Sequence, residues 1–108
     1  MSLNVVFTSQ LPKLDLHGET RDSARVAIND FIRDSIKMKH ETVVIVHGKG
    51  TGILKNTTQE VLRKNKHVKE FGIDYYNEGS TIVRIQFDKN WKIWYYFGRN
   101  NQEKILIK

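Results

Sequence analysis

Apolar residues recur with a helical period in two stretches of the chain. In the first stretch they fall three and four residues apart from Ala24 to Ile36, which predicts one buried stripe on a helix that continues through Lys39. Thr20 precedes this stretch and can cap the helix. The second stretch predicts a helix over roughly residues 53–65. Its expected inner face consists of Ile53, Leu54, Val61 and Leu62.

Shorter apolar runs predict four strands. Residues 13–17 lie between Pro12 and Gly18, and residues 42–47 contain four consecutive β-branched side chains, as a buried strand does. Residues 68–76 and 80–87 are expected to pair around a turn at 77–79. The predicted order is therefore βαβαββ, a mixed α/β domain built as a two-layer α+β sandwich.

The last twenty residues depart from this scaffold. An aromatic run at 91–97, a turn at 98–101 and residues 102–108 predict an added β-hairpin with aromatic side chains on both faces. An isolated hairpin needs an apolar surface to lie on, so extra core or a homodimer edge is favoured over stacking on bases. The expected organisation is a domain at 11–87 followed by a basic, aromatic extension at 88–108.

Composition narrows the class of protein. A chain of 108 residues with 39% hydrophobic and 28% charged residues fits one soluble globular domain. It contains neither an apolar run of the ~20 residues that span a bilayer nor the start of a signal peptide. The absence of cysteine excludes thiolate zinc sites and cysteine nucleophiles and fits a reducing compartment, so we expect a cytoplasmic protein, either complete or a fragment of a larger one.

Positive charge is concentrated in two segments. Residues 37–69 hold eight Lys and Arg against two acids, and residues 89–108 hold five against one, in a chain of net charge +6. Such segments suggest a polyanionic partner, most simply nucleic acid. A solubilising surface is the alternative interpretation.

Two of the predicted strands end in similar motifs, Asp15-Leu16-His17-Gly18 and His47-Gly48-Lys49-Gly50. If these strands are parallel, both histidines arrive at the carboxyl edge of the sheet, where open α/β sheets bind ligands. Strand alternation places Asp15 and His17 on one face, so the carboxylate can orient the imidazole for general acid or base chemistry near neutral pH. Alternatively, each histidine only satisfies a loop carbonyl.

The glycine-rich loop at 48–52 has the features of a phosphate site. Glycines let backbone N–H groups approach an anion, and the loop opens onto a helix N-terminus whose dipole favours negative charge. The spacing matches neither a Walker motif nor a dinucleotide fingerprint, which leaves the phosphates of a nucleic-acid backbone as the better fit. The predicted nucleic-acid-binding residues are Gly48, Lys49, Gly50, Thr51, Gly52 and Lys55.

These motifs resemble a known family. Leu14-Asp15-Leu16-His17-Gly18, then His47-Gly48-Lys49-Gly50-Thr51-Gly52 about 30 residues later, then Thr81-Ile82-Val83, are similar to the small MutS-related (Smr) domain over residues 11–87. The resemblance implies a fold similar to the carboxyl-terminal domain of translation initiation factor three, and DNA nicking or RNA cleavage, including mRNA cleavage on stalled ribosomes. It implies a catalytic role for Asp15 and His17 and backbone binding by His47 and the loop. The glycine-rich turn that usually precedes Thr81 keeps only Gly79 here.

The sequence thus predicts a nucleic-acid-binding domain with endonuclease activity and no cofactor. On RNA, His17 oriented by Asp15 would deprotonate the ribose 2′-OH, and His47 or Lys49 would stabilise the phosphorane, so Asp15, His17 and His47 form the expected catalytic set. A metal bound by these three residues is a weaker alternative. The competing class is a binding module for nucleic acid or the ribosome without chemistry. Backbone contacts do not separate DNA from RNA.

Overall fold

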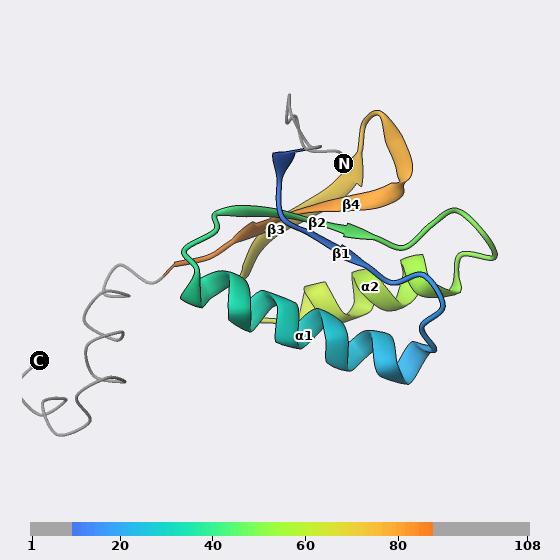
Figure 1. Cartoon of the computed structure of the whole chain (residues 1–108), viewed down its shortest axis with the longest axis horizontal. Helices are drawn as coiled ribbons and strands as arrows, with labels where there is room; N and C mark the ends of the chain where they lie inside the picture. The colour runs from blue at the N-terminus through green and yellow to red at the C-terminus, as the bar shows by residue number, and fades with distance from the viewer. Residues whose placement is uncertain (1–9, 88–108) are drawn as a thin grey trace, which may run out of the picture.

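Two helices and a four-stranded sheet make up the fold (Figure 1). The structure, a computed structural model, describes residues 10–87. The elements in chain order are β1 (Lys13–Asp15), α1 (Arg21–Lys37), β2 (Thr42–Val46), α2 (Ile53–Lys64), β3 (Val68–Asp74) and β4 (Asn77–Ile85). The predicted βαβαββ order and fold class are confirmed. The predicted hairpin within 88–108 lies outside the described residues.

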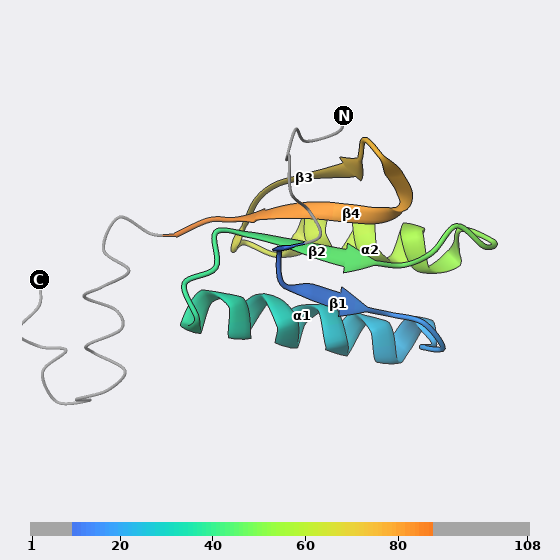
Figure 2. The ribbon, with the colours of Figure 1, turned by 45° about the horizontal axis from the view of Figure 1, so that its top comes forward.

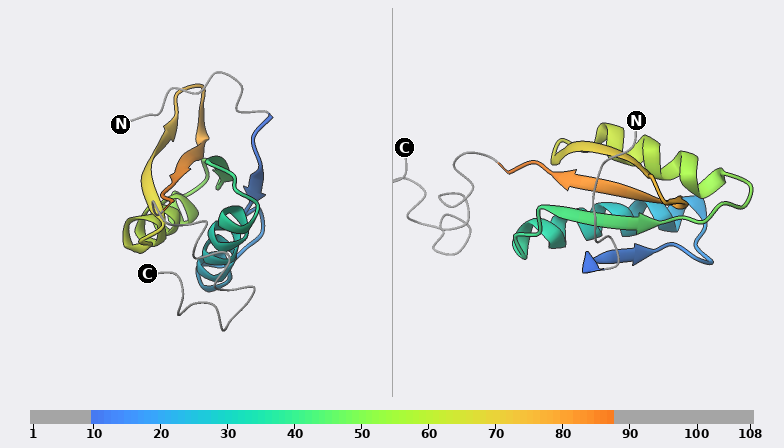
Figure 3. Two further views of the ribbon diagram at one scale, coloured as in Figure 1. Left: turned by 90° about the vertical axis from the view of Figure 1, so that its left-hand side faces the viewer. Right: turned by 90° about the horizontal axis from the view of Figure 1, so that it is seen from above.

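The strands form one sheet in the order β1-β2-β4-β3. β1 and β2 are parallel, and β4 is antiparallel to both β2 and β3. Both helices cover the same face of the sheet and run side by side in the same direction (Figures 2 and 3). The parallel pair therefore confirms the shared carboxyl edge, and the N-termini of α1 and α2 lie at that same edge.

The main core fills the space between the helices and the sheet. Ala24, Ile28 and Ile32 of α1 are fully buried against Val43 and Ile45 of β2 and their neighbours, as the helical stripe predicts. The N-terminus of α1 is closed by a capping box in which Thr20 and Ser23 bond reciprocally. On the opposite face of the sheet, Val44 and Ile82 form a small second cluster.

The hairpin that joins β3 to β4 differs from the prediction. Its turn is Tyr75-Tyr76, with Asp74 paired to Asn77, so the expected turn at 77–79 is wrong and those residues belong to β4. Side-chain acceptors explain the shift. The Asp74 carboxylate accepts the N–H of Tyr76 at 2.9 Å, and the Asn77 side chain accepts the N–H of Gly79 at 2.9 Å. The Gly79 carbonyl is thereby left to bond toward β2.

Candidate functional site

The segment after β1 holds His17 at the carboxyl edge of the sheet. Leu16 is fully buried, while Asp15 and His17 on either side of it are exposed, as the predicted alternation requires. The Asp15 carboxylate accepts the backbone N–H of His17 at 2.9 Å, and Gly18 follows with φ of +83°. Asp15 thus fixes the turn that carries His17. Within residues 10–87 the His17 imidazole itself forms no hydrogen bond.

The parallel register brings the two histidine motifs together. Asp15 is the partner of Val46, and the N–H of Leu16 donates to the Val46 carbonyl at 2.9 Å. His17 and His47 each follow this last rung of the ladder. Both therefore leave the sheet at the same edge, beside the 48–52 loop that leads into α2.

His47 is buried, in contrast to His17. Its ring is 7% exposed, with Nδ1 2.9 Å from the Gly48 carbonyl and Nε2 2.8 Å from the Thr81 hydroxyl. A carbonyl can only accept, so Nδ1 carries the hydrogen and Nε2 accepts from Thr81. Burial lowers the pKa of His47, the bond to the Gly48 carbonyl opposes this shift, and the charge of Lys55 adds to it. The neutral ring ties the start of the loop to β4.

Gly79 completes this tie from the β4 side. Its carbonyl accepts the backbone N–H groups of both His47 and Gly48, each at 2.9 Å. A Cβ atom on Gly79 would lie 3.2 Å from the Gly48 Cα, so the two backbones approach more closely than a larger residue allows. Sequence reasoning treated Gly79 and Thr81 as turn and strand residues. The retained glycine and the Thr81-Ile82-Val83 motif were the available signals for their role.

The 48–52 loop presents backbone and positive charge at the edge. Gly48 and Gly52 have φ of +78° and +87°, and no atom lies within 4 Å of a Cβ placed on Gly50. Gly52 caps α2 without a side-chain hydrogen bond, in contrast to the capping box of α1. The Thr51 hydroxyl reaches the first α2 amide only at 3.4 Å. The N-terminal dipole of α2 is therefore left for an anion.

The charge at this edge is mixed. Lys49 is exposed and Lys55 half-buried, and within the described part of the chain neither forms an ion pair, whereas exposed Asp15 approaches from the β1 side. Among residues 10–87, no three His, Cys, Asp or Glu side chains come together to hold a metal ion. Asp15, His17 and His47 thus do not form the three-ligand site considered as an alternative. No helix in the same range is long and apolar enough to span a membrane.

The family model of the Smr domain matches residues 14–86, most of the described fold. The chain belongs to the Smr domain family. Endonuclease MutS2 of Geobacillus sp. (strain WCH70) is 42% identical over 73 residues, which cover 68% of this chain and 9% of that protein. Endonuclease MutS2 of Caldanaerobacter subterraneus subsp. tengcongensis is 38% identical over 74 residues, again 68% and 9%. This Smr chain thus spans only about a tenth of the length of these relatives.

Two solved structures show the same fold. The crystal structure of the Smr domain of Thermus thermophilus MutS2 superposes with a TM-score of 0.69 at 28% identity, covering 70% of this chain and 99% of that one. YdaL, a stand-alone small MutS-related protein from Escherichia coli, has a TM-score of 0.67 at 20% identity, covering 71% and 66%. The likeness to YdaL is evidence for the Smr fold alone. Together they confirm the fold expected from the motifs.

Proposed function

We propose that this Smr domain binds nucleic acid at the carboxyl edge of β1 and β2 and cleaves its phosphodiester backbone. The observation that carries the proposal is the parallel register of Asp15 with Val46, because it brings exposed His17 to the same edge as the 48–52 loop. The relatives named Endonuclease MutS2 support the same reaction class.

The loop supplies the binding half of the proposal. Its exposed backbone, the uncapped N-terminus of α2 and the cations of Lys49 and Lys55 together suit a backbone phosphate. The buried ring of His47 holds this loop against β4 through Gly48 and Thr81. We therefore assign His47 a positioning role in place of the expected direct contact with the phosphorane, because both of its ring nitrogens are already bonded.

His17 supplies the chemical half. On RNA, its imidazole takes the proton of the ribose 2′-OH, the 2′-oxygen attacks phosphorus, and the 5′-oxygen leaves and takes up a proton. Lys49 stabilises the charged phosphorane, and Asp15 orients His17 through the backbone. The products are a 2′,3′-cyclic phosphate and a 5′-hydroxyl end. A general base of this kind contributes on the order of 10²–10⁴ in rate.

The test is an assay of the purified chain on labelled single- and double-stranded DNA and RNA, with and without EDTA. We expect RNA to be cut in EDTA, to leave a cyclic phosphate, and to resist cleavage when the nucleotide 5′ to the scissile phosphate is 2′-deoxy. Metal-dependent nicking of DNA, or RNA products with 5′-phosphate ends, would overturn this mechanism and leave the binding half intact.

A binding module without chemistry is the second candidate. The observation that favours it is that the Asp15 carboxylate bonds the backbone N–H of His17 and not its imidazole. The variant His17→Ala separates the two candidates. For an enzyme, cleavage is lost while affinity is nearly unchanged, because a general base adds little to ground-state binding. A wild-type chain that binds but cuts none of the four substrates is a binding module.

A further inference from the structure

Four exposed cations gather at the end of the molecule opposite the candidate site. We call this cluster the basic pole, and it consists of Lys37, Arg63, Lys66 and Lys69. Lys37 ends α1, Arg63 lies in the last turn of α2, and the other two precede and begin β3. Because both helices run in the same direction, their C-terminal ends meet here, at the end that faces the viewer in the left view of Figure 3.

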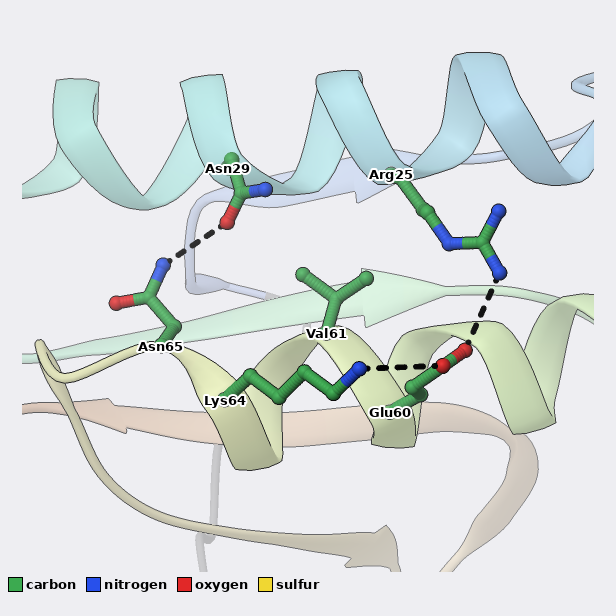
Figure 4. A pocket seen from close by; sticks show the side chains of 6 residues that line it. All are labelled: Arg25, Asn29, Glu60, Val61, Lys64 and Asn65. Carbon is green, nitrogen blue, oxygen red and sulfur yellow. Dashed lines mark hydrogen bonds and ion pairs between the residues drawn. The ribbon is translucent and has the colours of Figure 1, made fainter.

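The basic pole differs from the groove between the helices, where charges are paired. Figure 4 shows Arg25 bonded to Glu60 at 3.3 Å and Lys64 to the same carboxylate at 3.5 Å, with Asn29 and Asn65 joined at 3.0 Å further along. These residues line a cleft of about 240 Å³ that is thus closed by polar links. Its cations are neutralised within the fold.

The four cations of the basic pole have no such compensation. Within residues 10–87, none of them forms an ion pair or a side-chain hydrogen bond. Two exposed carboxylates, Asp34 and Glu41, lie toward the same end of the fold, so a positive excess remains. Crowding like charges opposes folding, and a bound polyanion removes that repulsion.

The helix dipole accounts for only part of this arrangement. Lys37 and Arg63 lie in last helical turns, where a cation is stabilised by the dipole. Lys66 and Lys69 lie outside both helices, so the dipole gives no reason for their charge. The fold places them beside the helix ends all the same.

We propose that the basic pole binds the phosphate backbone of the same nucleic acid whose scissile phosphate lies at the candidate site. The inference rests on the proposed function and extends it to a second contact region. The 17 residues of α1 separate the two ends by about 25 Å. A strand that rises ~3.4 Å per nucleotide covers this distance in about seven base pairs of duplex, so the pole contacts phosphates well away from the cleaved bond.

The double variant Lys66→Gln/Lys69→Gln tests the inference through salt-dependent binding of a labelled 20-base-pair duplex. Each lost phosphate contact lowers the slope of log affinity against log salt by ~0.9, so we expect a decrease of about 1.8 and roughly 30-fold weaker binding at 0.15 M salt. The control is Arg33→Gln, which also removes a positive charge, but one that Asp30 already offsets at 2.9 Å. Its slope should be unchanged.

The variant Lys49→Ala separates this inference from the proposed function. If Lys49→Ala lowers the slope and the double variant does not, the pole makes no contact and the candidate site stands. If the double variant alone lowers it, the pole binds and the site loses its support. A wild-type chain that binds no duplex overturns both.

Discussion

A buried imidazole that bonds through both ring nitrogens gives this domain a pH-sensitive joint. The pKa of His47 is lowered in the folded state, so protonation favours the unfolded chain. The contribution of His47 to stability is then complete above its unfolded value of 6.5 and is lost as the pH falls through the lower folded pKa. We expect the free energy of unfolding to decrease between pH 7.5 and 5.

Urea unfolding across this pH range measures the effect. The variant His47→Gln removes the titrating ring and should flatten the decrease, whereas His17→Gln should retain it because the His47 joint is intact. Thr81→Val leaves Nε2 without its donor and should cost ~1–3 kcal/mol at neutral pH. An unchanged pH dependence in His47→Gln would refute the assignment of the joint.

Gly79 and Gly50 form a matched pair of glycines. A Cβ on Gly79 meets the Gly48 backbone at 3.2 and 3.3 Å, and backbone atoms cannot move aside cheaply, so Gly79→Ala should destabilise the fold by ~1–3 kcal/mol. Gly50 has open space and no positive φ, so Gly50→Ala should change stability by less than ~0.5 kcal/mol. Equal unfolding midpoints in urea would contradict the close approach of Gly79.

At the scale of elements, the 48–52 loop and the start of α2 form one phosphate-binding unit. Gly50→Val should weaken nucleic-acid binding while leaving stability nearly unchanged, because the side chain occupies the open space that a phosphate needs. Lys49→Ala should lower the salt slope by about one phosphate contact. Titrations at several salt concentrations check both variants. Unchanged affinity and slope would mean that the glycines serve only as a turn.

The elements also show what the sequence can and cannot predict. Helical spacing placed α1, and the β-branched run placed β2, because burial repeats with the period of each element. The β3–β4 turn was misplaced because Asn77-Glu78-Gly79 has turn chemistry, yet its side-chain and carbonyl bonds serve the junction with β2. The burial of His47 was equally hidden, since it depends on Thr81, which is 34 residues away.

At the scale of the whole molecule, the extension at 88–108 is a separable part of the chain. We expect its deletion to lower the free energy of unfolding or to abolish dimerisation, and to leave cleavage intact, because the proposed site lies entirely within the described fold. Urea unfolding, analytical ultracentrifugation and the RNA assay report on these three properties. A deletion variant that is equally stable and monomeric but binds RNA far more weakly would show that the aromatic strand contacts bases.

β1 is a strand of three residues at the border of the sheet, paired only with β2 in the described fold. Such a strand separates from its neighbour at a lower free energy than the central strands, so local opening precedes global unfolding. The amide of Leu16 should therefore exchange with deuterium faster than those of Val83 and Ile45. Each opening event would carry His17 away from the loop while the helices and the remaining strands stay folded. Heat would then silence the chemistry of this domain at temperatures where its circular dichroism still reports a native fold.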